Sequence, residues 1–345
     1  MNKNPFTLMY GIPSNSVISR DESLNTILNS FLFSDSMYMY LIIGIRGSGK
    51  TVLLRDVYNK LSNQDNWLTV DLNPQGEIIQ SLSNKLSASS PKSLLDGWSI
   101  SINLPHISIK KKDKEINDPE IISEKIIEKL SSDNKKVLIT IDEVNNTKDF
   151  QKFANFYQSL IGKGLKVYLL LTGLKENINS IVNDKAMTFL TRAPKIELEP
   201  LSLPAITLEY QNVFDISKDE ATKMAKLTNG YAFAYQVLGY MFYESKNRVL
   251  DKDFIQKYDQ YLWSNGYNKF WTDLTDVERN FLKSLANSKS GSKEEMINSK
   301  LIKESNYSQY RKRLIEKGLI YQPKYDCLDF VLPRFREFIS YVKDF

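Results

Sequence analysis

Apolar residues in the first 200 positions form short runs that alternate with longer amphipathic segments. Short apolar runs bounded by glycine, proline or polar turn residues predict buried strands. We expect these strands at Tyr38–Gly44, Trp67–Leu72, Val137–Ile141, Lys166–Leu171 and Lys195–Leu198. Helical spacing of apolar residues predicts helices at about Asp21–Leu32, Thr51–Leu61, Glu77–Leu86, Pro119–Leu130 and Phe150–Gly162. Strands that alternate with helices indicate an α/β fold with a parallel sheet flanked by helices.

Two other regions depart from this alternation. Residues 97–112 contain two short alternating stretches around Pro105-His106, which predicts a hairpin inserted into the first domain. After Pro204 the pattern becomes helical, with helices expected at about Ala205–Phe214, Ser217–Thr228, Tyr231–Ser245 and Asp253–Trp263. Breaks near residues 200–204 and 271–274 then divide the chain into an α/β domain at 1–200, a helical lid at 201–270 and a last domain at 271–345.

Composition narrows the classes of function. The 345 residues are 42% hydrophobic and 25% charged, as in an ordinary globular protein. The single Cys327 excludes a disulfide scaffold, and the single His106 excludes a site built from several histidines. The apolar runs are far shorter than the roughly 20 residues of a membrane helix, and the first residues lack the pattern of a secretion signal. We therefore expect a cytoplasmic protein with no membrane partner.

The strongest motif lies between the first expected strand and the following helix. Its eight residues fit the pattern GxxxxGK[ST], and they are Gly44, Ile45, Arg46, Gly47, Ser48, Gly49, Lys50 and Thr51. Glycines let the backbone wrap around phosphate groups, and the start of the helix adds its positive dipole end. Lys50 is expected to reach the β and γ phosphates, and the Thr51 hydroxyl is expected to bind Mg²⁺. The motif predicts a site for ATP or ADP.

Two adjacent carboxylates follow the strand Val137–Ile141. Asp142 would hold Mg²⁺, and Glu143 would orient and activate the water that attacks the γ phosphate. An Asp-Glu pair at this place favours an ATP-hydrolysing enzyme over a small-molecule kinase. A GTPase is disfavoured because residues 146–149 have the wrong order for a guanine-binding loop.

These motifs resemble those of P-loop ATPases of the AAA+ and STAND (archaeal-ATPase-like) class, which are related to archaeal origin-recognition initiators. The resemblance implies that Arg20 lies near the adenine and that Thr172, at the end of a strand, senses the γ phosphate. It also implies that Arg192 acts as an arginine finger on the nucleotide of a neighbouring subunit. Residues 229–232 resemble the GxP motif of STAND proteins, with Ala232 in place of the proline.

The last domain resembles a winged helix-turn-helix. Three helices are expected at about 276–286, 293–299 and 308–317, followed by strands at 319–322 and 328–332. In such domains the third helix enters the DNA major groove. Residues 300–324 hold seven Lys or Arg against two Glu, a net charge of +5 that equals the excess of the whole chain. The candidate DNA contacts are Arg311, Lys312, Arg313 and Lys317.

Taken together, the sequence predicts a Mg²⁺-dependent ATPase of low basal turnover that works as a molecular switch, with duplex DNA as its partner. The alternative is a signalling or defence STAND ATPase whose winged helix contacts a partner protein and does not bind DNA. Self-association of the chain is a further expected partnership. The two functions differ in whether the basic third helix binds DNA.

Overall fold

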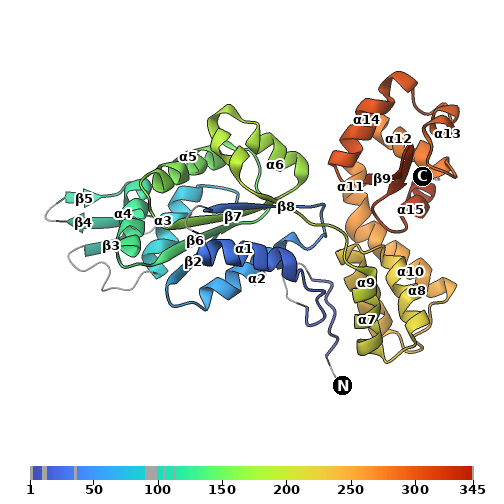
Figure 1. The fold of residues 1–345 in the computed structure, drawn as a ribbon, viewed down its shortest axis with the longest axis horizontal. Helices are drawn as coiled ribbons and strands as arrows, with labels where there is room; N and C mark the ends of the chain where they lie inside the picture. The colour runs from blue at the N-terminus through green and yellow to red at the C-terminus, as the bar shows by residue number, and fades with distance from the viewer. Residues whose placement is uncertain are drawn as a thin grey trace. The chain divides into compact units, whose positions relative to one another are not determined.

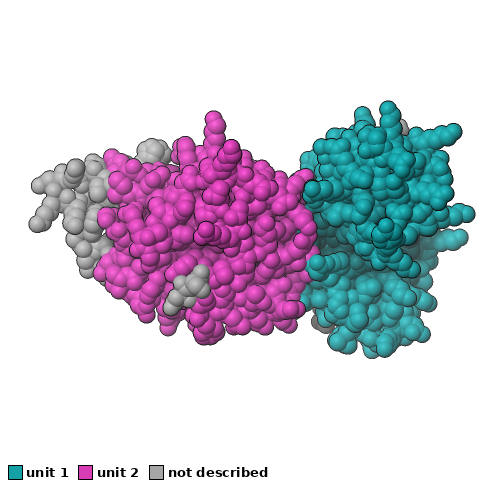
Figure 2. All heavy atoms as spheres, turned by 45° about the horizontal axis from the view of Figure 1, so that its top comes forward, with its two compact units in different colours: residues 1–19, 44–49, 199–345 teal, residues 20–43, 50–198 magenta. Residues whose placement is uncertain are grey.

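The computed structural model describes residues 3–9, 14–34, 37–89, 99–103, 106–111 and 114–343. The chain divides into two compact units, which Figures 1 and 2 show and which are described separately below. Unit 1 contains residues 1–19, 44–49 and 199–345. Unit 2 contains residues 20–43 and 50–198. In the part of the chain that the structure describes, no helix has the length and apolar character needed to cross a membrane.

Unit 2 is built on a five-stranded sheet with the order β2-β6-β7-β1-β8. Each neighbouring pair is parallel. The strands are β1 Met39–Ile43, β2 Trp67–Leu72, β6 Lys136–Ile141, β7 Val167–Gly173 and β8 Lys195–Glu197. The helices are α1 Asp21–Phe33, α2 Lys50–Ser62, α3 Ile78–Ser89, α4 Pro119–Ser132, α5 Lys148–Gly162 and α6 Lys175–Val182. The expected α/β fold is confirmed.

Alternating strand residues divide the core of this unit between the two faces of the sheet. Leu41, Ile139 and Leu169 pack in a cluster that includes residues of α3, α4 and α5. Their neighbours Ile42 and Leu138 pack in a second cluster that includes residues of α1 and α2. Strands buried on both faces read as continuous apolar runs, which is why the sequence pattern located them.

Polar residues set the start of several helices. Asp118 accepts hydrogen bonds from the first turn of α4, which begins with Pro119. Thr147 caps α5 by accepting from the Phe150 backbone N–H at 3.1 Å. In unit 1, Thr275 and Glu278 form a reciprocal capping box at the start of α12 (Asp276–Asn287).

The inserted region contains a small antiparallel sheet of three strands. They are β3 Ser99–Asn103, β4 His106–Lys111 and β5 Lys114–Ile116. Strands β3 and β4 pair as an antiparallel hairpin, with Asn103 opposite His106. The sequence pattern predicts only two strands here, because the charged run at 110–114 obscures the start of β5. Trp98, Leu104, Pro105, Lys112 and Asp113 lie outside the described residues.

The helical part of unit 1 shares one hydrophobic cluster from Leu201 to Ile339. Its helices are α7 Leu203–Phe214, α8 Lys218–Thr228, α9 Ala232–Glu244, α10 Lys252–Leu262, α11 Asn268–Thr272, α12 Asp276–Asn287, α13 Lys293–Asn298, α14 Glu304–Glu316 and α15 Phe335–Lys343. Antiparallel strands β9 (Ile320–Lys324) and β10 (Cys327–Phe330) lie between α14 and α15. Three helices followed by a hairpin is the element order of a winged helix. The domain limits at 200 and 270 remain a proposal.

The N-terminal segment is an integral part of unit 1. The Phe6 ring packs on Tyr210, Phe214 and Tyr235. It also occupies the space beside Gly239 in α9, where an added Cβ atom would lie 2.5 Å from the ring. This packing could not be predicted from local sequence patterns, because the contacts join residues more than 200 positions apart.

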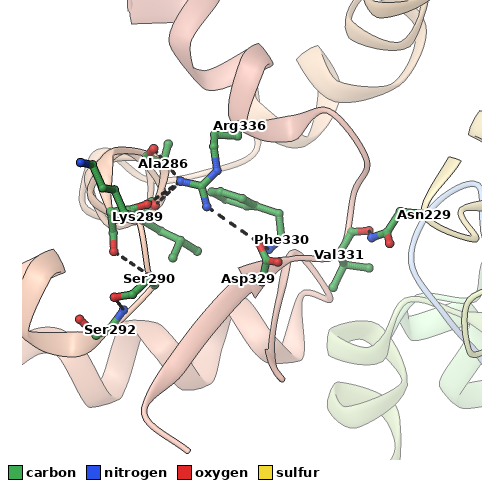
Figure 3. A network of polar contacts seen from close by, with 12 residues as sticks. Asn229, Ala286, Lys289, Ser290, Ser292, Asp329, Phe330, Val331 and Arg336 are labelled. Atoms are coloured by element: carbon green, nitrogen blue, oxygen red, sulfur yellow. Dashed lines mark hydrogen bonds and ion pairs between the residues drawn. The ribbon is translucent and has the colours of Figure 1, made fainter. Parts of the chain in front are cut away.

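Arg336 of α15 closes the carboxyl end of α12, as Figure 3 shows. Its Nη1 donates to the carbonyl oxygens of Leu285, Ala286 and Ser288 at 3.1, 2.8 and 2.7 Å. The last carbonyls of a helix have no partner within the helix, so a cation is favourable there. The guanidinium also lies over the Phe330 ring, 5.5 Å from its centroid. One side chain thereby joins α12, β10 and α15.

A second arginine joins α10 to the chain just before α15. Arg334 donates from Nε and Nη2 to the two carboxylate oxygens of Asp259, at 2.8 and 2.6 Å. The Asp259 side chain is 7% exposed, and Arg334 Nη1 also reaches Glu337 at 2.7 Å. The hydrogen bond to Asp259 raises the pKa of Arg334 above its ordinary value. This bidentate pair links α10 to the segment that leads into α15.

Candidate active site

The phosphate-binding motif begins directly after β1 and ends in the first turn of α2. Residues 44–49 belong to unit 1, whereas Lys50 and Thr51 begin α2 in unit 2. Gly47 and Gly49 have φ values of +70° and +95°, a backbone conformation that only glycine adopts readily. The Ser48 N–H donates to the Ile45 carbonyl at 3.3 Å and closes a β-turn. Lys50 is only 4% exposed.

Asp142 lies between two threonine hydroxyls in unit 2. Thr51 Oγ1 donates to Asp142 Oδ2 at 2.7 Å, and Thr172 Oγ1 donates to Asp142 Oδ1. The parallel register explains this meeting, because Ile141 of β6 is opposite Leu171 of β7 and places the next residues side by side. The structure therefore brings together three residues that the sequence predicted separately, from α2, β6 and β7.

Glu143 adopts an unusual backbone conformation beside this network. Its φ is +54°, in the left-handed region that non-glycine residues rarely adopt. Two hydrogen bonds hold it there, from the Glu143 N–H to Thr172 Oγ1 at 3.0 Å and from the Val144 N–H to the Thr172 carbonyl at 2.9 Å. The side chain is exposed. The Thr172 hydroxyl thus bonds both the Asp142 carboxylate and the Glu143 backbone N–H, and it fixes the direction in which Glu143 leaves the sheet.

The oxygens at this edge suit a magnesium ion. Asp142 supplies a carboxylate and Thr51 a hydroxyl, and the oxygens that hydrogen-bond are 2.7 Å apart. Mg²⁺ prefers such hard oxygen ligands and normally keeps waters and substrate phosphates in its remaining positions. Thr51 lies in the first turn of α2 and Asp142 directly follows β6, so regular elements set the positions of both residues.

A third carboxylate near the ends of the strands escaped the sequence analysis. Asp71 of β2 accepts from Arg55 Nη2 of α2 at 2.9 Å and from Thr140 Oγ1 of β6 at 2.8 Å. It is opposite Thr140 in the register of the two strands. The signal was available, since Asp71 is an acidic residue in an otherwise mostly apolar strand. The pair with Arg55 connects the helix that begins with Lys50 to the neighbouring strand.

The two arginines assigned through the family resemblance lie at ends of elements in unit 2. Arg20 immediately precedes α1 and is partly exposed. Arg192 is exposed and is the last residue of a 3₁₀ helix at Lys185–Arg192, which the sequence analysis did not predict.

The four basic residues at the end of α14 have different surroundings. Lys312 and Arg313 are exposed, and the Arg313 guanidinium lies 5.5 Å from the centroid of the Tyr310 ring. Arg311 donates to the Gln322 side chain on β9 at 2.5 Å. Lys317 instead pairs at 2.8 Å with Glu278, whose side chain is only 3% exposed. Its ammonium therefore compensates a buried charge within the unit.

Two family models match separate parts of the sequence. Residues 18–182 match an ATPase domain predominantly from Archaea. Residues 265–339 match a domain of unknown function (DUF8462). No curated protein matches the sequence.

Similar solved structures extend over the whole chain. The ORC2 protein of Aeropyrum pernix in ADPNP-ADP complexes has a TM-score of 0.62 at 14% identity, covering 97% of this chain and 96% of that one. Cdc6p from Pyrobaculum aerophilum has a TM-score of 0.52 at 15% identity, covering 100% of this chain and 98% of that one. The chain therefore has the fold of these two proteins, and its residues 18–182 match the model of an ATPase domain found predominantly in Archaea.

Proposed function

We propose that this protein binds and hydrolyses ATP with Mg²⁺ and uses the bound nucleotide as a switch. The network of Thr51, Asp142 and Thr172 is the observation that carries the proposal, because it joins the end of the phosphate motif to the acidic pair. The archaeal ATPase domain match and the fold of nucleotide-bound ORC2 support it. Lys50 would bind the β and γ phosphates, and the backbone of residues 44–49 would surround them.

Each residue of the acidic site has a proposed part in hydrolysis. Asp142 and Thr51 would hold Mg²⁺, which when bound offsets the charge that develops on the phosphate oxygens. Glu143 would accept hydrogen bonds from the attacking water and orient it, since its exposed carboxylate leaves the sheet at a fixed angle. Thr172 would report the γ phosphate to Asp142 and Glu143, because its hydroxyl contacts both residues.

The same proposal includes two arginines. Arg20 would lie near the adenine. Arg192, exposed at the end of its 3₁₀ helix, would stabilise transition-state charge on the nucleotide of a neighbouring subunit. Self-association of the chain is therefore part of the proposed catalytic cycle.

Replacing Lys50 with methionine tests nucleotide binding. A charged hydrogen bond contributes about 1.5–3 kcal/mol, so the Kd for Mg·ATP should rise by roughly 10- to 150-fold. Lys60→Met is the matched control, because Lys60 is an exposed lysine in the last turn of the same helix. Equilibrium titration with a fluorescent ATP analogue measures both. Equal affinities of the two variants would remove Lys50 from the proposed site.

We further propose that ATP binding controls contact with duplex DNA through α14. The exposed side chains of Lys312 and Arg313, with Arg311 one position earlier, offer the phosphate contacts. Lys317 would support the helix by neutralising Glu278. The concentration of basic charge in residues 300–324 favours DNA over the alternative, a partner protein bound by the same domain.

The DNA proposal predicts salt-dependent binding that the Lys312→Gln/Arg313→Gln double variant weakens. The test uses Glu143→Gln protein with and without Mg·ATP across a salt titration. Each lost phosphate contact should lower the slope of log K against log salt by about 1. Lys218→Gln/Lys223→Gln makes the same charge change on exposed positions of α8 and should leave the slope unchanged. Absence of DNA binding at low salt by a protein that still binds ATP would assign the domain to protein contact.

A further inference from the structure

Two consecutive carbonyl groups of the phosphate motif are bound by residues at the start of α9. The Tyr231 hydroxyl donates to the Arg46 carbonyl oxygen at 2.8 Å. The Phe233 backbone N–H donates to the Gly47 carbonyl oxygen at 3.0 Å. All four residues belong to unit 1. The lid helices therefore contact the backbone of the motif directly, at the peptide groups on either side of Gly47.

The first of these bonds acts on the middle peptide of a β-turn. The Ser48 N–H bonded to the Ile45 carbonyl closes the turn, so Arg46 and Gly47 are its central residues. A φ of +70° at Gly47 is the value that the third residue of a type II turn requires. Types I and II differ by a flip of the middle peptide. A hydrogen bond to the Arg46 carbonyl selects one of the two orientations.

Fixing a carbonyl also fixes the N–H on the same peptide plane. A trans peptide is planar, so its N–H and C=O point in opposite directions. The Arg46 carbonyl is directed at Tyr231, and the Gly47 N–H is consequently directed away from it. Backbone N–H groups of this motif are the donors that bind phosphate. The orientation of one such donor thus depends on a side chain of the lid.

The contact is close and admits little variation. A Cβ atom on Gly47 would lie 2.5 Å from the Tyr231 hydroxyl and 2.9 Å from the Phe233 Cβ. Tyr231 is 5% exposed, and burial raises the pKa of its phenol, which keeps the hydroxyl protonated as a donor. Gly230, which precedes it, accepts a hydrogen bond from the Leu201 N–H at 2.7 Å. Tyr231 is therefore held in place independently of the motif.

The second bond serves α9 as well as the motif. Tyr231 is the N-cap residue of α9, and its side chain makes no capping hydrogen bond. The first N–H groups of a helix have no partner within the helix. The Gly47 carbonyl accepts a hydrogen bond from one of these groups, the Phe233 N–H. A movement of the motif that breaks this bond would leave the Phe233 N–H at the start of α9 without a partner. The motif therefore affects the start of α9, just as Tyr231 affects the motif.

We propose that Tyr231 is a positioning residue of the nucleotide site, which orients the Gly47 N–H for phosphate through its hydrogen bond to the Arg46 carbonyl. This inference rests on the proposed ATP-binding function. It makes the lid part of the phosphate site through backbone geometry rather than through a charged side chain on the nucleotide. Without the bond, the peptide between Arg46 and Gly47 is no longer held in the orientation that directs the Gly47 N–H at phosphate. We therefore expect bound nucleotide to dissociate faster.

The test removes the hydroxyl alone, with Tyr231→Phe. Titration and stopped-flow release of a fluorescent ADP analogue should show a Kd raised about three- to tenfold, mostly through a faster dissociation rate. Tyr267→Phe is the matched control. Its buried hydroxyl donates to the Pro333 carbonyl at 2.6 Å in the same unit, and not to a carbonyl of the motif. The control should lose a similar amount of thermal stability and keep the wild-type affinity.

Three outcomes would overturn the inference. Wild-type affinity in Tyr231→Phe would show that the bond does not position the donor. An equal loss of affinity in both variants would show only a general loss of stability, which thermal melting of each protein measures. Failure of the wild-type protein to bind any adenine nucleotide would reject the proposed function itself, and is distinguished by the wild-type titration.

Discussion

Glu143→Gln protein is expected to bind Mg·ATP as tightly as the wild type and to hydrolyse it about 10²- to 10⁴-fold more slowly. Glutamine preserves the size of the side chain, and the bonds that fix residue 143 use its backbone N–H and that of Val144. The left-handed conformation should therefore persist. Only the carboxylate that orients and activates the water is lost.

Phosphate release under saturating Mg·ATP measures the rate, and an equilibrium titration measures binding on the same samples. Glu120→Gln in the first turn of α4 is the matched control, because it makes the same substitution at another exposed position of unit 2. Turnover at the wild-type rate in Glu143→Gln would remove this residue from catalysis. Lost binding would show that the change disturbs the Asp142 network.

Arg334→Met is expected to lower the free energy of unfolding by about 3–5 kcal/mol. Methionine keeps the apolar length of the side chain but leaves the Asp259 carboxylate buried without its guanidinium. Asp259 is 7% exposed and receives both hydrogen bonds of the bidentate pair, so water cannot easily replace them. Urea unfolding followed by circular dichroism measures the change.

Two comparisons make this result specific. Lys269→Met breaks an exposed ion pair, whose partners are 59% and 52% exposed, and should cost less than about 1 kcal/mol. The double variant Asp259→Leu/Arg334→Met removes the buried charge as well and should recover most of the loss. An Arg334→Met midpoint equal to that of Lys269→Met would contradict the assigned importance of the pair.

Local patterns were sufficient for the fold class. The buried strands read as apolar runs, and glycine, proline and capping residues mark the limits of most helices. Helices α6, α11 and α15 were not predicted, although the apolar residues Phe335, Phe338 and Ile339 of α15 have helical spacing. The contribution of Phe6 to the core beside α9 could not be predicted, since it depends on a contact across more than 200 residues.

The site shows the same division between local and long-range information. The GxxxxGK[ST] motif and the end of an apolar strand were enough to propose Lys50, Thr51, Asp142 and Glu143. Hydrogen bonds across the sheet, such as those of Asp71 with Arg55 and Thr140, depend on strand order and register. The resemblance to the GxP motif pointed to residues 229–232 but not to the bond between the Tyr231 hydroxyl and Arg46. The ion pair of Lys317 with Glu278 also depends on a long-range contact. Because of this pair, Lys317 differs from the exposed residues Lys312 and Arg313 of α14.

The most direct test of the central claim is a titration of the wild-type protein with ATP, in the presence and in the absence of Mg²⁺. The arrangement of Lys50, Thr51 and Asp142 predicts saturable binding of one nucleotide per chain, with higher affinity when Mg²⁺ is present. Absence of saturable binding by folded protein under both conditions would contradict the assignment of this site to ATP.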